Sequence, residues 1–161
     1  MVSTFRKLFF GLSITILNVS LANDATAQRR GSRDREMSKP QVKRVVERVE
    51  NRVDVFVKNY DRSLDRSRVN GTSREDWLNR RANDLENATD ELRREFDRRD
   101  RWAENREEVR RCLNIASDID HNMRNYRFGR QTETNWARVR YELNTLANVY
   151  NLPRVAAMAY N

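Results

Sequence analysis

Apolar side chains recur every three or four residues in four separate stretches of this sequence, the spacing at which they share one face of a helix. In the first stretch, residues 40–67, the stripe resembles a coiled-coil seam. The stripe consists of Val42, Val46, Val49, Val53, Phe56 and Tyr60. Val45, Val57 and Leu64 widen it beyond what a two-stranded coil needs. We therefore expect this helix to pack in a bundle.

The same rhythm continues in three later stretches, which predict helices over residues 74–100, 105–126 and 133–150. The second helix has a thinner stripe, made of Trp77, Arg81, Leu85, Ala88, Leu92 and Phe96. The third helix would bury Val109, Cys112, Ala116, Ile119, Met123 and Tyr126. The fourth would bury Trp136, Val139, Leu143, Leu146 and Tyr150.

Capping residues and turns separate the stretches. Ser38 followed by Gln41 predicts a capping box at the start of the first helix. Asn70-Gly71 predicts the end of that helix, because either residue tolerates the left-handed conformation. Thr72 is expected to cap the second helix and Thr132 the fourth.

These features predict an all-α fold, an antiparallel four-helix bundle built from two helical hairpins over residues 38–152. Only four glycines and two prolines occur in the chain, which argues against a β-sandwich or barrel. At 1.5 Å per residue the first two helices would each be about 40 Å long and the second pair shorter. We expect the longer hairpin to overhang the shorter one and to leave apolar surface for a partner, such as a second copy in a homodimer.

The N-terminal segment, residues 1–27, has the pattern of a cleaved signal peptide. Arg6 and Lys7 precede an apolar run, and the small residues Ala25 and Ala27 predict cleavage before Gln28. The alternative is a membrane anchor, for which a run of about 15 residues is short. We expect export to a bacterial periplasm or to the medium, a disordered basic leader over 28–37 and a flexible tail over 153–161.

Cys112 is the only cysteine in the 161 residues, so an exported form has no internal disulfide. A single thiol could join two chains. Its place in the apolar stripe of the third helix favours instead a small, buried side chain.

Basic residues are concentrated before and within the first helix, where residues 28–52 hold nine of them against four acidic residues. Arg44, Arg48 and Arg52 follow at intervals of four, which places like charges side by side at a cost in helix stability. An anion opposite them would relieve the repulsion, and the guanidinium suits phosphate or carboxylate. The alternative is a solvated face in a protein whose arginines outnumber its lysines 28 to 4.

Other candidate chemistry is sparse. Asp118, Asp120 and His121 are close in sequence, but helix geometry directs His121 away from the core and separates the two carboxylates, so no metal site is predicted. Most carboxylates have an arginine or lysine one turn later, as in Glu107–Arg111, Asp90–Arg94, Glu95–Arg99 and Asp54–Lys58. Such pairs support helices. The sequence predicts no catalytic residues and no cofactor.

Residues 113–152 resemble a pattern found in uncharacterised exported bacterial proteins of acidobacterial type. The matching residues are Ala116, Ile119, Asp120, Met123, Asn135-Trp136 and the segment Leu143 to Asn151, with Arg74 to Asn79 as a partner motif. The resemblance implies an exported helical protein and no known activity. In size and charge the chain is also similar to small periplasmic helical chaperones.

Taken together, these observations predict a non-enzymatic binding protein of the cell envelope that uses its first helix to engage anionic envelope components. The alternative is a holdase-type chaperone or stress protein that binds client proteins. Chromosomal nucleic acid is not an expected partner outside the cytoplasm.

Overall fold

The computed structural model describes residues 37–155. The expected signal peptide, its cleavage residues Ala25, Ala27 and Gln28, and most of the expected leader lie outside these residues. None of the helices within 37–155 combines the length and the apolar character that a membrane crossing requires.

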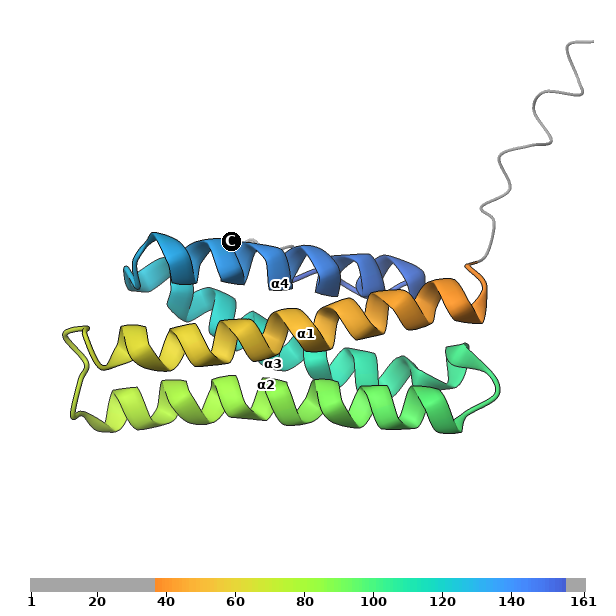
Figure 1. Cartoon of the computed structure of the whole chain (residues 1–161), viewed down its shortest axis with the longest axis horizontal. Coiled ribbons are helices and arrows are strands. Elements are labelled where there is room, and N and C mark those ends of the chain that lie inside the picture. The colour runs from red at the N-terminus through yellow and green to blue at the C-terminus, as the bar shows by residue number, and fades with distance from the viewer. Residues whose placement is uncertain (1–36, 156–161) are drawn as a thin grey trace, which may run out of the picture. The chain divides into compact units, whose positions relative to one another are not determined.

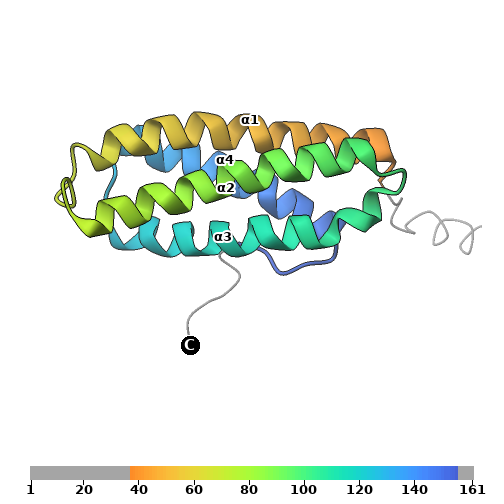
Figure 2. The same ribbon diagram turned by 90° about the horizontal axis from the view of Figure 1, so that it is seen from below.

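Four antiparallel helices form the bundle, which confirms the predicted all-α architecture (Figure 1). They are α1 (Lys39–Leu64), α2 (Ser73–Arg98), α3 (Arg106–Asn125) and α4 (Arg130–Val149), with a 3-10 helix, η2 (Trp102–Asn105), before α3. Helix α1 packs against both α2 and α4, and α3 packs against the same two helices (Figure 2). The chain therefore runs up and down around a single core.

The core stripe of α1 agrees with the prediction at all six positions, from Val42 to Tyr60. The stripe of α2 was predicted wrongly in its first two turns. Leu78 and Ala82, each 1% exposed, face the core in place of Trp77 and Arg81. From Leu85 onward the predicted and observed faces coincide. Trp77 lies at the edge of the core, where the guanidinium of Arg74 stacks over its ring at 4.7 Å from the centroid.

Two of the three predicted helix starts are confirmed. The backbone N–H of Ser38 donates to Gln41 Oε1 at 2.8 Å, and Thr72 Oγ1 accepts from the Glu75 amide at 3.4 Å. The third start is wrong, because α4 begins directly after Gly129, whose φ of 89° favours glycine. Thr132 is instead buried within the helix and shares a 2.6 Å hydrogen bond with Ser63 of α1.

The connections cover both ends of the bundle. At one end Trp102 of η2 packs edge-on against Tyr150 at 5.3 Å. At the other, Phe128 packs edge-on against Tyr60 at 5.0 Å. In residues 37–155 the only large apolar side chains that are exposed are Val55 and Tyr141. The expectation that an overhanging hairpin leaves apolar surface uncovered is therefore wrong for the described residues.

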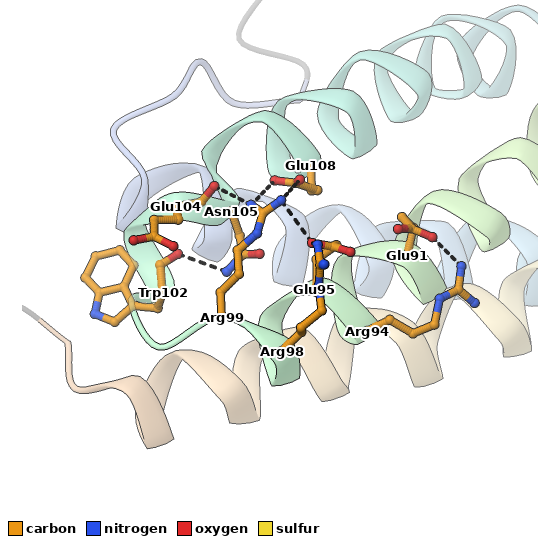
Figure 3. Close-up of polar contacts among 9 residues, drawn as sticks. All are labelled: Glu91, Arg94, Glu95, Arg98, Arg99, Trp102, Glu104, Asn105 and Glu108. Carbon is orange, nitrogen blue, oxygen red and sulfur yellow. Dashed lines mark hydrogen bonds and ion pairs between the residues drawn. The ribbon is translucent and has the colours of Figure 1, made fainter.

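Polar contacts of Arg99 join η2 to its neighbouring helices (Figure 3). Arg99 reaches Glu108 of α3 at 2.8 Å and Glu95 of α2 at 2.9 Å. Because Arg99 also donates to the carbonyl of Glu104, one guanidinium holds α2, η2 and α3 together.

The last described residues pack on the bundle. Val155 is 2% exposed. Its amide donates to Asn144 Oδ1 at 2.8 Å, and its carbonyl accepts from Asn144 Nδ2 at 3.3 Å. The third residue of the expected flexible tail, 153–161, is thus hydrogen-bonded to α4, and residues 156–161 lie outside the described residues.

Candidate anion-binding face

Arg44, Arg48 and Arg52 lie on the exposed side of α1 that adjoins α4. Their neighbours across this seam follow from the antiparallel packing, in which Phe56 contacts Trp136 at 5.0 Å between ring centroids. Arg48 has an anion opposite it within the protein: its Nε lies 3.0 Å from both carboxylate oxygens of Glu142. The predicted arginine ridge is therefore present, and its middle member is already paired.

A shallow groove of about 500 Å³ runs beside the ridge and is lined by Arg52, Thr134, Ala137, Arg138, Tyr141 and Glu142. Arg52 and Arg138 approach it from opposite helices. Tyr141 is 71% exposed at its edge, and Val55, which is 46% exposed, lies one helical turn beyond Arg52. Both of the exposed large apolar side chains in the described residues thus adjoin arginines of this seam.

We call Arg44, Arg48, Arg52 and Arg138 the arginine face. Within residues 37–155, Arg44, Arg52 and Arg138 form no ion pair and no side-chain hydrogen bond. Unpaired guanidinium groups keep their five donors available and bind phosphate or carboxylate in a bidentate manner. The arrangement can therefore hold an anion chemically, and its apolar border can contact the part of a ligand that lies behind the charge.

The opposite side of α1 differs, since its charges are matched. Lys43 lies 2.8 Å from Asp97 of α2, and Arg93 of α2 lies 2.9 Å from Glu47. Acidic groups are in excess further along this seam. Burial, with Asp54 and Asp90 nearby, raises the pKa of Glu86. On the α2 side, Lys43 and Arg93 are thus paired with carboxylates, whereas Arg52 on the α4 side is not paired within the described residues.

Arg138 was not among the predicted site residues. It is far from Arg52 in sequence, and no pattern local to either helix relates them. The signal that could have found it is the exposed face of α4 itself, because Arg138 and Tyr141 both lie outside the stripe that runs from Trp136 to Tyr150. Pairing that face with α1 requires the topology.

Asp120 is a buried carboxylate, although the sequence did not assign it to the core stripe of α3. It is 2% exposed. Its Oδ1 accepts from Trp136 Nε1 at 2.9 Å and from Arg140 at 3.0 Å, and its Oδ2 accepts from Arg124. Burial alone would raise the pKa of Asp120, but these hydrogen bonds outweigh it and hold the pKa below its ordinary value.

The other members of that sequence cluster are separated from Asp120, as expected. Asp118 pairs with Arg81 of α2. His121 is exposed, and its Nε2 lies 3.0 Å from Asn125 Nδ2. The structure therefore brings none of the three together into one site.

The predicted helix-surface pairs are confirmed in part. Arg99 reaches Glu95 at 2.9 Å. In two predicted pairs the partner differs: Arg94 pairs with Glu91 and not with Asp90, and Glu107 pairs with Arg110, at 2.5 Å, and not with Arg111. Both spacings stabilise a helix to a similar degree.

Cys112 is fully buried in α3, as its place in the stripe suggested. Burial raises the pKa of its thiol to about 12. A thiol in this state is inert at neutral pH. Cys112 can therefore join two chains only if the bundle opens.

The chain matches no protein-family model, no curated protein and no solved structure.

Proposed function

We propose that this protein is an exported, non-enzymatic binding protein of the cell envelope, and that its arginine face holds an anionic envelope component. The observation that carries the proposal is the presence of three unpaired arginines on one seam, Arg44, Arg52 and Arg138, with Tyr141 beside them. Export rests on the signal-peptide pattern of residues 1–27.

The energetics of the seam support binding over a passive solvated surface. Arg52 and Arg138 line one groove whose carboxylate, Glu142, is paired with Arg48. Neighbouring like charges repel, and an incoming anion would remove that repulsion. On the α2 side of α1, by contrast, the same kind of exposed cations meet carboxylates of the protein itself.

Lipid head groups are the favoured anion. Tyrosine at a membrane interface places its ring against the acyl boundary and its hydroxyl in the head-group layer. Tyr141 and Val55 are suited to this position, because both project among or next to the arginines. A bare polyelectrolyte would use the arginines but gain little from either apolar side chain.

Sedimentation with vesicles tests the proposal. The chain is produced with its own leader in a bacterial host, and N-terminal sequencing checks for a cut before Gln28. We expect the exported protein to bind phosphatidylglycerol vesicles and not phosphatidylcholine vesicles, with binding that weakens as salt is raised. The triple variant Arg44→Gln, Arg52→Gln, Arg138→Gln should bind at least about tenfold more weakly.

A matched control separates the face from net charge. Arg94→Gln, Arg98→Gln, Arg110→Gln removes the same number of charges from arginines that are paired with carboxylates elsewhere on the surface. This variant should bind like the wild type. Equal losses in the two triple variants would contradict a specific face.

Tyr141→Ser should weaken binding to vesicles but not to soluble polyphosphate, and the reverse result would favour a polymer as the natural partner.

A further inference from the structure

A second group of arginines gathers at the end of the bundle where the 65–72 and 126–129 connections meet (Figure 1). Two adjoining hollows open there, of about 420 Å³ and about 430 Å³. Both are lined by Arg66, Ser67 and Arg127. Arg68 lines the first hollow and Arg130 the second. We call these four arginines and Ser67 the loop-end site.

The arginines of the loop-end site have no partners within residues 37–155: none of Arg66, Arg68, Arg127 and Arg130 forms an ion pair or a side-chain hydrogen bond there. Arginines toward the opposite end of the bundle provide a comparison, because those with carboxylate partners stabilise the structure and are not available to a ligand. Each arginine drawn in Figure 3 has a carboxylate partner. The loop-end site therefore concentrates positive charge that the described protein does not neutralise.

Further donors face the same hollows. The first backbone bond of α4 runs from the Glu133 amide to the Gly129 carbonyl at 3.1 Å, so the amides of residues 130–132 have no partner within the helix. Ser67 Oγ accepts from the Val69 amide at 3.2 Å, which leaves its proton to donate. Free amides at a helix start and guanidinium groups both favour a multiply charged oxyanion.

We propose that the loop-end site binds a diphosphate group, with one phosphate in each hollow and with Arg66 and Arg127 contacting both. Two adjoining hollows with shared arginines match two linked phosphates better than one phosphate or one carboxylate. Four guanidinium groups also suffice to neutralise the several negative charges of a diphosphate. This site is separate from the arginine face, and the proposal does not depend on the function proposed above.

Calorimetry at constant ionic strength tests the proposal with inorganic phosphate, inorganic pyrophosphate and farnesyl diphosphate as probes. We expect pyrophosphate to bind at least about tenfold more tightly than phosphate, because the second group adds charge-assisted hydrogen bonds. Equal affinity for phosphate and pyrophosphate would overturn the proposal. Tighter binding of farnesyl diphosphate than of pyrophosphate would identify a lipid-borne diphosphate as the source, and equal binding a free one.

Variants locate the site. Arg66→Gln with Arg127→Gln should weaken pyrophosphate binding at least about tenfold, whereas the triple variant of the arginine face should bind pyrophosphate like the wild type. Both sets of side chains are exposed, so neither should alter the circular dichroism spectrum. In an amide spectrum pyrophosphate should shift Gly129 and leave Trp102, at the other end of the bundle, unmoved. Unchanged affinity in the double variant, or an unmoved Gly129 amide, would overturn the proposal.

Discussion

The two sides of α4 use arginine in opposite ways. On the α3 side, Arg140 joins Trp136 and Arg124 around the buried carboxylate of Asp120. On the α1 side, Arg138 shares a groove with Arg52 and has no carboxylate partner within the described residues. The two arginines are only two positions apart in sequence, yet the first completes a network and the second does not.

This difference indicates where to look for function. Removing one member of a buried, hydrogen-bonded ion network strongly destabilises the fold, because it leaves the remaining members unpaired. An exposed, unpaired arginine contributes little to folding, and near a like charge it costs stability. Changes on the α3 side should therefore affect the free energy of unfolding, and changes on the α1 side should affect binding.

The largest effect is expected from Asp120→Ala. It leaves the buried Trp136 indole N–H without an acceptor and removes the partner of two arginines, so we expect unfolding free energy to fall by about 3 kcal/mol. Urea unfolding followed by circular dichroism measures this. Asp120→Asn retains an acceptor for Trp136 and should lose less, while Asp118→Asn, at a half-exposed position, should lose least.

Acid titration provides a second readout of the same variant. Because the pKa of Asp120 is lowered in the folded state, its stabilising contribution is complete above the unfolded pKa of about 4 and is lost as pH falls through the folded value. The difference in stability between wild type and Asp120→Ala should thus be constant from neutral pH down to about 5 and should shrink below about 4. A constant difference at all pH values would contradict this role.

A smaller effect, with opposite signs in two assays, is expected from Glu142→Gln on the α1 side. Glu142 is 10% exposed and pairs with Arg48, which is 48% exposed, so its neutralisation should cost roughly 1 kcal/mol or less. The same change frees Arg48 and raises the charge of the arginine face, so binding to anionic vesicles should strengthen a few fold. Parallel thermal unfolding and vesicle sedimentation check both signs. A loss of both stability and binding would show that Glu142 positions the face and does not compete with its ligand.

The smallest effect on stability should come from Arg52→Glu. The new carboxylate would face Arg138 across the groove, and we expect a gain of about 0.5 kcal/mol or less over Arg52→Gln, as is usual for exposed pairs. Vesicle binding should fall further than in Arg52→Gln. If Arg52→Glu is less stable than Arg52→Gln, the two side chains do not meet across the seam.

The bundle could be predicted from the sequence because each helix carries an apolar stripe with its own period. Where the stripe is dense, as in α1, every core position was correct. At the start of the α2 stripe, Trp77 lies next to Leu78 and Arg81 lies next to Ala82. The prediction placed the larger Trp77 in the core, and the predicted core face was therefore rotated by one residue from the observed one. Leu78 and Ala82 are buried because this face of α2 packs against α1 and α3, and only the packing shows it.

The site was less predictable, since its members come from different helices. The arginine ridge of α1 has a local period and was found, but Glu142 and Arg138 are brought to it by the topology. The burial of Asp120 was not predicted, for a related reason. Its burial depends on Trp136 and Arg140 of α4, and a carboxylate beside a core stripe looks in sequence like any surface residue.

The up-and-down order of the helices places the first residues of α1 and the last of α4 at one end of the bundle, away from the 65–72 and 126–129 connections (Figure 1). A biosensor chip coupled just ahead of Met37 would therefore hold the bundle with Arg66 and Arg127 directed toward bulk solution. A fluorescent domain inserted between residues 65 and 72 would instead obstruct them. The same geometry thus decides where this protein can be immobilised and where it can be labelled.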